Sequence, residues 1–209
     1  MSNERKFLIG IGFTTLIIVV IGLLVFARGE KQVNKGVFAP EELLAGATHT
    51  MGEATAAAVI VEFGDYQCPA CGQAHPILKQ FLKDHDDSVY FVFRHFPLTA
   101  VHQNANDAAR SAEAAGKQGK YWEMHNILFE RQKEWSSLSD ARGKFEQYAK
   151  ELELDMDRFK ADQGQAIGVV NTDAALGTKA GVQSTPTFFV NGKMYPGVLT
   201  YDKLVELTK

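Results

Sequence analysis

The sequence predicts an α/β fold in which a strand–helix–strand unit is followed by an inserted helical subdomain and a closing strand hairpin. Three observations lead to this prediction. The apolar run 57–63 and the β-branched and aromatic run 89–93 flank a segment with helical periodicity, which is the order of a βαβ unit with a right-handed crossover. The segment 101–179 is helical throughout and exceeds an ordinary crossover. The run 185–190 then returns to strand character.

Ahead of this fold, the amino-terminal residues predict a transmembrane helix. Residues 7–26 are an uncharged run of about 20 residues, which as a helix measures roughly 30 Å and matches the bilayer core. A secretory signal has a shorter apolar region, although Val25-Phe26-Ala27 offers a cleavage site. We expect an uncleaved membrane anchor over residues 1–27. Basic residues flank both of its sides, so charge does not decide its orientation, and we expect the amino terminus inside the cell and the domain outside.

Residues 28–50 are expected to be a juxtamembrane linker, and residues 51–209 the folded domain. Pro40 and the acids after it suit a short helix that would stop at Gly46. With 209 residues, 45% of them hydrophobic, and a net charge of -3, the chain suits one domain that carries an insertion. The mild acidity and the lack of a basic stripe argue against a nucleic-acid partner.

The first predicted strand, residues 57–63, is nearly continuous in apolar residues, as in a strand covered on both faces. Glu62 lies inside it. An unpaired buried carboxylate is unfavourable, so Glu62 is expected to reach an edge, to find a cationic partner or to have a raised pKa. The strand end would bring it beneath Cys68 and Cys71, where a carboxylate can pass protons to and from the more buried cysteine. An ordinary ion-paired glutamate is the alternative.

The next helix begins in the segment Cys68-Pro69-Ala70-Cys71, which holds both cysteines of the chain. Proline suits the first helical position and disfavours helical backbone in the residue before it, so Cys68 is predicted to be the N-cap. A sulfur at the cap faces unpaired N–H groups and the positive end of the helix dipole, and both favour the thiolate. Cys68 is therefore the predicted nucleophile, and Cys71, in the first turn, its resolving partner.

Other interpretations of the cysteine pair are weaker. In the entropy model, a structural disulfide that closes so small a loop stabilises by roughly 2 kcal/mol, against about 4.7 kcal/mol for a hundred-residue loop. A metal site would take His75, one turn beyond Cys71, as a third ligand, whereas zinc normally takes four protein ligands or three and a water. Haem attachment needs histidine where Gly72 stands. We expect a redox pair and no metal.

The segment 101–179 carries alanines and aromatic residues at helical spacing, with glycines between its helices. Because it is almost eighty residues long, we interpret it as a helical subdomain inserted into the α/β fold. Its aromatic residues are expected to form a core rather than to contact a cofactor. His102 and His125 are expected to be surface or capping groups.

The carboxyl-terminal part predicts a hairpin and a closing helix. Asn191-Gly192 follows the run 185–190 and is a strong signal for a tight hairpin turn, with residues 193–195 as the returning strand. Thr200 is a possible N-cap for an amphipathic helix over residues 201–207.

Four motifs occur along the chain in a fixed order: EFGDYQCPAC at 62–71, RHFPL at 94–98, EAAG at 113–116 and GVQSTPTF at 181–188. In sequence, order and spacing they resemble the DsbA-like thiol-disulfide oxidoreductases of bacterial envelopes, and more closely their membrane-anchored branch. The resemblance covers about residues 45–209.

This resemblance implies a thioredoxin fold split by the helical insertion, with a cis bond between Thr185 and Pro186. It implies that this loop lies against the cysteine pair and that the backbone of Thr185 pairs with an extended substrate segment. Glu62 matches the family's buried acid in position and type.

The implied reaction is dithiol–disulfide exchange, in which a substrate thiolate attacks Cys68 and a second substrate thiol resolves the mixed disulfide. A membrane quinone-linked partner, DsbB- or VKOR-like, would reoxidise Cys68 and Cys71. The substrates would be exported proteins with cysteines, and no cofactor is required. The protein would be a single-pass protein of the bacterial cell membrane with its domain on the extracytoplasmic side. We expect a monomer, because no dimerisation segment is evident.

The best-known oxidases of the family carry Pro-His between the cysteines, whereas this chain has Pro69-Ala70. Ala70 supplies no charge or donor, so we predict a Cys68 thiolate less stabilised than theirs; reference pKa values are about 7 for thioredoxin and about 3.5 for DsbA. An oxidase is the leading hypothesis. The alternatives are a reductase or isomerase of the same fold, or a metal-binding or chaperone-like envelope domain that uses Cys68, Cys71 and His75.

Overall fold

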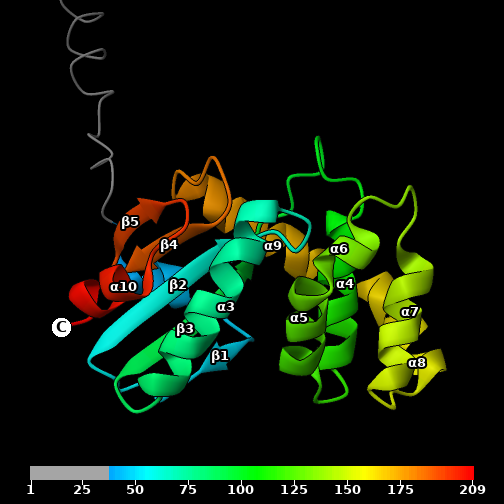
Figure 1. Ribbon diagram of the computed structural model, residues 1–209, viewed down its shortest axis with the longest axis horizontal. Helices are drawn as coiled ribbons and strands as arrows, with labels where there is room; N and C mark the ends of the chain where they lie inside the picture. The colour runs from blue at the N-terminus through cyan, green and yellow to red at the C-terminus, as the bar shows by residue number, and fades with distance from the viewer. Residues whose placement is uncertain (1–37) are drawn as a thin grey trace, which may run out of the picture. The chain divides into compact units, whose positions relative to one another are not determined.

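The computed structural model describes residues 38–209 and contains a five-stranded mixed sheet, which lies to one side of the inserted helices (Figure 1). Its strands are β1 (Thr50–Met51), β2 (Ala58–Gly64), β3 (Val89–His95), β4 (Thr187–Val190) and β5 (Lys193–Pro196). Their order is β1-β3-β2-β4-β5, and β2 pairs with β3 in parallel while the other neighbours are antiparallel. The predicted βαβ unit is therefore confirmed, and β1 is an edge strand that the sequence did not reveal.

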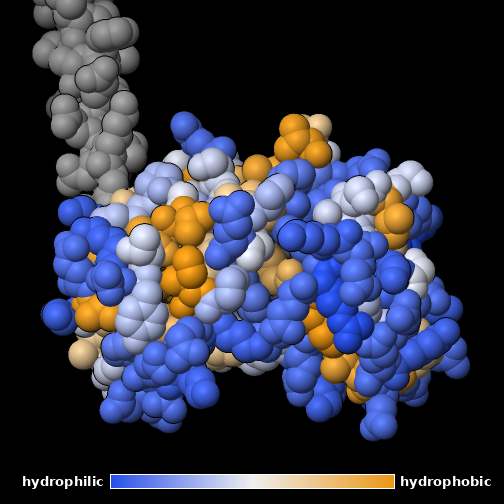
Figure 2. All heavy atoms as spheres, in the orientation of Figure 1, coloured by the Kyte–Doolittle hydropathy of each residue, from blue (hydrophilic) through white to orange (hydrophobic). Residues whose placement is uncertain are grey.

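Helices flank the sheet and form the insertion beside it (Figure 1). They are α2 (Pro40–Leu44), α3 (Pro69–Asp84), α4 (Ala105–Gly116), α5 (Tyr121–Glu130), α6 (Gln132–Trp135), α7 (Arg142–Glu151), α8 (Met156–Gln165), α9 (Ile167–Lys179) and α10 (Tyr201–Leu207). Figure 2 shows hydrophilic side chains over most of one face, with hydrophobic residues in separate patches. Within residues 38–209, no helix has both the length and the apolar character needed to span a membrane.

The side chains of β2 alternate between two apolar cores. Ile60 belongs to the core that includes α3, α10 and the inserted helices, whereas Val61 and Phe63 belong to the core on the other face of the sheet. Successive side chains of a strand point to opposite faces, so Glu62 shares the face of Ile60 and lies toward α3. This alternation places the carboxyl group on the side of the helix that begins at Cys68.

The insertion is shorter than predicted at its carboxyl end. Helices α4 to α8 belong to it, but α9 packs back on the sheet, where Asp173 accepts a hydrogen bond from Arg94 of β3 at 2.8 Å. A Cβ atom at Gly177 would lie 2.6 Å from the ring of Phe96, so the close approach of α9 requires glycine. The expected boundary at 179 was wrong because helical periodicity does not tell an inserted helix from one that covers the sheet.

The folded domain begins before residue 51, which corrects the predicted linker boundary. Leu43 of α2 is buried, and its carbonyl oxygen accepts hydrogen bonds from the guanidinium group of Arg94 at 2.9 and 3.3 Å. The N–H of Phe38 donates to the carbonyl of Gly192 at 2.8 Å. Residues 38–50 therefore pack on the sheet. The predicted membrane anchor, residues 1–27, lies outside the described residues.

The carboxyl-terminal predictions are confirmed. Asn191 and Gly192 both have positive φ, 49° and 80°, as a tight primed hairpin turn requires. The Thr200 side chain accepts a hydrogen bond from the N–H of Lys203 and caps α10. The inserted helices bury their large aromatic residues, including Trp135 and Phe145, as expected for a core.

Candidate active site

Cys68 is the N-cap of α3, as predicted. Its backbone is extended, with φ -69° and ψ 123°, and Pro69 occupies the first helical position. Neither cysteine is in a disulfide. Cys68 is 7% exposed, and Cys71 is 0% exposed. The pair therefore presents one partly accessible sulfur and one fully covered sulfur.

The pKa of the Cys68 thiol is lowered to about 5. The largest cause is a hydrogen bond from the thiol of Cys71, and the side chain of Thr185 and the amides of Cys71 and Ala70 add to it, while burial opposes the shift. When protonated, Cys68 Sγ donates to the carbonyl oxygen of Thr185 at 3.2 Å, which by itself favours the thiol. The donors outweigh that carbonyl, so Cys68 is a thiolate at neutral pH.

The pKa of Cys71 moves in the opposite direction. Burial is the first cause of its increase, followed by the hydrogen bond to Cys68 and the negative charge of Glu62. The N–H of Asp65 approaches Cys71 Sγ at 3.5 Å and opposes the increase only weakly. The two sulfurs thus differ as the predicted roles require, although nucleophile and resolving cysteine stay predictions.

Glu62 lies between two phenylalanines on the sheet face toward α3. Its partners across the sheet are Phe93 on β3 and Phe188 on β4, and the residue is 3% exposed. Burial, and then the charge of Cys68, raise the pKa of Glu62 to about 8. Of the three outcomes expected for this carboxyl group, its burial in a central strand favours a raised pKa, and within residues 38–209 it forms no ion pair. It is protonated at neutral pH.

The bond between Thr185 and Pro186 is cis, and the loop lies against the cysteine pair through the contact of Thr185 with Cys68 Sγ. Both features agree with the resemblance drawn from the sequence. Thr185 is 7% exposed. Pairing of its backbone with a substrate stays a prediction.

A family model described as thioredoxin matches residues 44–209. The chain belongs to this thioredoxin family. It is similar to the structure of a thioredoxin-like oxidoreductase from Silicibacter pomeroyi, with 26% identity over 80% of this chain and 94% of that one and a TM-score of 0.67. Oxidised BdbD from Bacillus subtilis is also 26% identical, over 79% and 92% of the two chains, with a TM-score of 0.69. The protein therefore has a DsbA-like thioredoxin fold.

This DsbA-like protein is also similar to one part of several antiporters. The Na(+)/H(+) antiporter NhaA 3 of Salinispora tropica is 42% identical over 159 residues, which are 75% of this chain and 23% of that protein. NhaA 1 of Mycobacterium sp. (strain KMS) is 38% identical over 155 residues, 71% of this chain and 24% of that protein. The chain spans about a quarter of the length of these relatives, so their transport activity is not carried over to it.

Asp65 organises the loop ahead of Cys68, and the sequence reasoning did not single it out. Its buried carboxylate accepts hydrogen bonds from the N–H of Gln67 at 2.8 Å, the N–H of Leu98 at 2.9 Å and the ring of His102 at 2.7 Å. The bond to Gln67 is an Asx turn, which is the one local signal that could have revealed it. His102, expected to be a surface or capping group, is partly exposed and joins this loop through its bond to Asp65.

The inserted helices reach over the start of α3. Gln132 of α6 donates from Nε2 to the carbonyl oxygens of Tyr66 and Cys68, at 2.7 and 2.9 Å. A Cβ atom at Gly72 would lie 2.7 Å from Gln132 Oε1, so glycine allows this approach. The insertion of the DsbA-like fold thus supports the backbone of Cys68.

The metal-binding alternative fails in its predicted ligands. His75 does not converge with the cysteines; its ring stacks on Phe129, with centroids 4.9 Å apart, and lies 5.3 Å from the ring of His125. A different group of possible metal-ligand side chains, within residues 38–209, has its ligand atoms within 4.8 Å of one another. His125 is also corrected, because it is buried and its Nδ1 is hydrogen-bonded to the Tyr66 hydroxyl at 2.9 Å.

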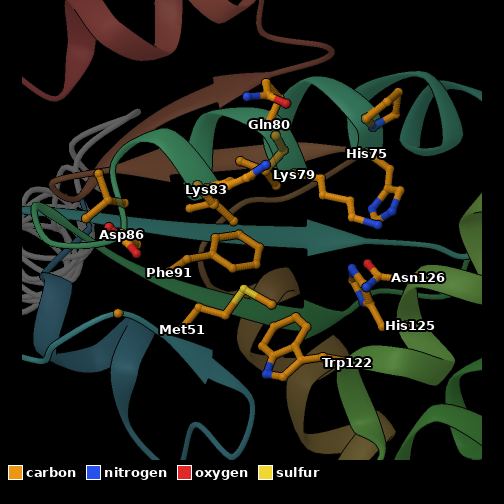
Figure 3. Close-up of a pocket in the computed structure, with 15 residues that line it drawn as sticks. Met51, His75, Lys79, Gln80, Lys83, Asp86, Phe91, Trp122, His125 and Asn126 are labelled. Atoms are coloured by element: carbon orange, nitrogen blue, oxygen red, sulfur yellow. The ribbon is translucent and has the colours of Figure 1, made fainter.

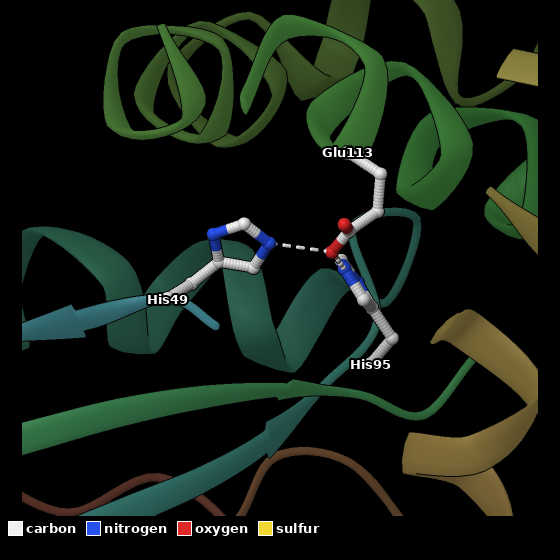
Figure 4. Close-up of side chains that lie close together, drawn as sticks. All are labelled: His49, His95 and Glu113. Carbon is white, nitrogen blue, oxygen red and sulfur yellow. Dashed lines mark hydrogen bonds and ion pairs between the residues drawn. The ribbon is translucent and has the colours of Figure 1, made fainter. Parts of the chain in front are cut away.

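That group is His49, His95 and Glu113 (Figure 4). The Nε2 atoms of both histidines lie at 2.6 and 2.8 Å from the same carboxylate oxygen, Oε1 of Glu113. Ligands of tetrahedral zinc at 2.0–2.1 Å are about 3.3 Å apart, so these distances are those of hydrogen bonds. The cluster ties the segment before β1 and the end of β3 to α4.

Replacing Glu113 with glutamine is expected to destabilise the protein by about 2 kcal/mol at pH 7, because two charge-assisted hydrogen bonds become neutral ones. Burial opposes ionisation, but the bonds from His49 and His95 lower the Glu113 pKa to about 2. This stabilisation is present above the ordinary pKa of 4.5 and is lost as the pH falls toward 2. Urea unfolding at pH 7 and pH 3 measures it, with exposed Glu123→Gln as the control. An equal loss for both variants would contradict it.

Titration of the Cys68 thiolate by its absorbance at 240 nm is expected to give a pKa near the value of about 5 that the geometry supports. The Cys71→Ser variant would leave one sulfur to observe and keep a hydroxyl donor beside it. A pKa near 3.5 would mean that Ala70 does not weaken the thiolate relative to DsbA. A pKa above 8 would show an ordinary thiol and contradict the site.

Proposed function

We propose that this protein is a thiol-disulfide oxidoreductase of the bacterial cell envelope, and that it oxidises cysteine pairs in exported proteins through Cys68 and Cys71. The observation that supports this most is the opposite shift of the two sulfurs. The pKa of Cys68 is lowered to about 5 at a helix N-terminus, beside a buried Cys71 whose pKa is raised. Attack on the disulfide is favoured at Cys68 because Cys71 is fully covered, and the low pKa of Cys68 makes it a good leaving group from the mixed disulfide.

The first step begins from the Cys68–Cys71 disulfide. A substrate thiolate attacks Cys68 Sγ, a mixed disulfide forms, and the S–S bond breaks so that its electron pair goes to Cys71. Because Cys71 is disfavoured as a thiolate, it takes a proton, and the protonated carboxyl group of Glu62, with a pKa of about 8, can supply it.

In the second step, another substrate thiolate attacks the substrate sulfur of the mixed disulfide. The substrate disulfide forms, and Cys68 leaves with the electron pair. Its low pKa makes it a good leaving group, since exchange is faster when the leaving thiol has a lower pKa. The enzyme ends with both cysteines reduced and its substrate oxidised by two electrons.

Substrate selection would use the cis-proline loop. The backbone of Thr185 would pair with an extended segment of the substrate, as in strand addition. The contact of the Thr185 carbonyl with Cys68 Sγ at 3.2 Å supports this, because a segment bound there would bring its own sulfur beside Cys68.

The proposal extends to location and partners on the basis of the sequence. The apolar run 7–26 would anchor the chain in the membrane, with the domain outside the cytoplasm. A quinone-linked, DsbB- or VKOR-like membrane protein would return the cysteines to the disulfide. Loss of the oxidised form in cells that lack such a partner would test this step.

The redox potential separates an oxidase from a reductase or isomerase. A Cys68 pKa about two units below neutral pH stabilises the reduced form and raises its reduction potential by about 60 mV above the thioredoxin value of about -270 mV. We therefore expect a reduction potential of roughly -210 mV. Equilibration of the full chain in glutathione buffers measures it, alongside oxidation of a reduced, unfolded test protein. Ala70→His serves as the matched variant and is expected to be more oxidising. A potential near -270 mV would favour the reductase.

A further inference from the structure

A pocket of about 590 Å³ lies between α3, β1, β3 and α5 (Figure 3). This volume is in the range of small-molecule sites. Met51, Phe91 and Trp122 form much of its apolar wall, and the rings of Phe91 and Trp122 are 6.0 Å apart between centroids. None of the residues of the candidate active site lines it, so the pocket is separate from the cysteine pair.

One end of the pocket carries a polar group without a partner. His75 is 7% exposed, and its Nε2 atom makes no hydrogen bond within residues 38–209. Figure 3 shows this ring facing His125 and Asn126 across that end of the pocket. Burial lowers the His75 pKa to about 4, so the ring is neutral at pH 7 and can donate one hydrogen bond. Buried polar atoms are normally satisfied, and this one indicates a missing partner.

The carboxylate of Glu130 and the ammonium group of Lys79 both lie near His75. Lys79 is four residues further on α3, so it shares the helix face of His75, and Lys83 follows after one more turn. The ion pair of Lys79 with Glu130, at 2.6 Å, is about half exposed on both sides and therefore weak. Lys83 forms no ion pair among residues 38–209. The pocket lining itself holds these two ammonium groups and one carboxylate, Asp86, so it favours an anion that competes with Glu130 for Lys79.

We propose that this pocket binds a small aromatic monocarboxylate, with its carboxylate on Lys79 and the Nε2–H of His75 and its ring against Trp122 and Phe91. The carboxylate supplies the acceptor that His75 lacks and pairs with the lysine. The aromatic body fits the wall because aromatic rings pack favourably in edge-to-face arrangements, and the Met51 sulfur adds a favourable contact.

The test uses 4-phenylbutyrate as the probe and its uncharged amide as the matched ligand, titrated into the full chain by calorimetry. The acid is expected to bind about tenfold more tightly than the amide, the low end for a hydrogen bond to a charged group. Lys79→Met should remove that preference without weakening the amide. Glu130→Gln, which removes the competing partner of Lys79 outside the pocket, should bind the acid at least as tightly as the unaltered chain.

A second measurement locates the probe. Binding should change the fluorescence of Trp122, and Trp122→Phe should abolish that change while Trp135, buried in the inserted helices, remains. Thiol-disulfide exchange should be unaltered in Lys79→Met, which shows that the variant folds. Equal affinity for acid and amide, no binding of either, or an unaltered preference in Lys79→Met would each overturn the proposal.

Discussion

Replacing Cys68 with serine is expected to abolish thiol-disulfide exchange, reducing the rate to that without enzyme. A hydroxyl group cannot form the mixed disulfide, and the hydrogen bonds from Cys71, Thr185 and the helix amides that lower the pKa of Cys68 to about 5 do not ionise serine at neutral pH. Oxidation of a reduced, unfolded test protein by the disulfide form, and reduction of insulin by the dithiol form, measure the loss.

Cys71→Ser is the matched control for this prediction. It keeps the nucleophile but removes the buried sulfur, so a mixed disulfide between Cys68 and a substrate or small thiol should accumulate and be visible by mass spectrometry. Full exchange activity in Cys68→Ser would refute the proposed function. Accumulation of a disulfide on Cys71 in that variant would instead reverse the two roles.

Replacing Glu62 with glutamine is expected to stabilise the reduced protein by about 3 kcal/mol at pH 7. The folded-state pKa of Glu62 is raised from 4.5 to about 8, so its ionisation is disfavoured in the fold. The native state keeps its full stability below pH 4.5 and loses stability as the pH rises toward 8, because the unfolded chain releases this proton earlier. Glutamine has no proton to release, so the gain should vanish at pH 4.

Urea unfolding at pH 4 and pH 7 measures this effect, with the exposed Glu53→Gln as the control. The same variant should exchange disulfides more slowly, because Cys71 loses its nearby proton donor, and its rate should lose the ionisation near pH 8. A gain of equal size at both pH values would mean that glutamine acts by packing. No gain at either would mean that Glu62 is solvated.

Several parts of the fold followed from local sequence alone. Pro69 placed Cys68 at the N-cap, Asn191-Gly192 placed the hairpin, and Thr200 placed the start of α10. Each of these depends on the backbone preferences of one or two residues, which neighbouring contacts do not override. The DsbA-like resemblance added the cis bond at Pro186, which local preference would not predict.

The predictions of domain boundaries and of the exposure of His125 failed because contacts with residues distant in the chain determine them. The short helix at Pro40 was predicted and is confirmed as α2, but the assignment of residues 38–50 to a linker missed β1 and the packing of α2 on the sheet, which depends on contacts such as the one between Leu43 and Arg94. The insertion was extended to 179 because α9 has the same periodicity as its neighbours. His125, expected at the surface, is buried by aromatic rings from several elements.

The residues by themselves determined which sulfur lies at the helix N-terminus, because capping is a property of adjacent residues. Only the tertiary structure decided how far the pKa values of Glu62 and Cys71 rise, because burial is the first cause of both and arises where segments far apart in the chain pack together. The lowered pKa of Cys68 is due first to the hydrogen bond from the neighbouring Cys71, and Thr185, which is distant in the chain, adds to it.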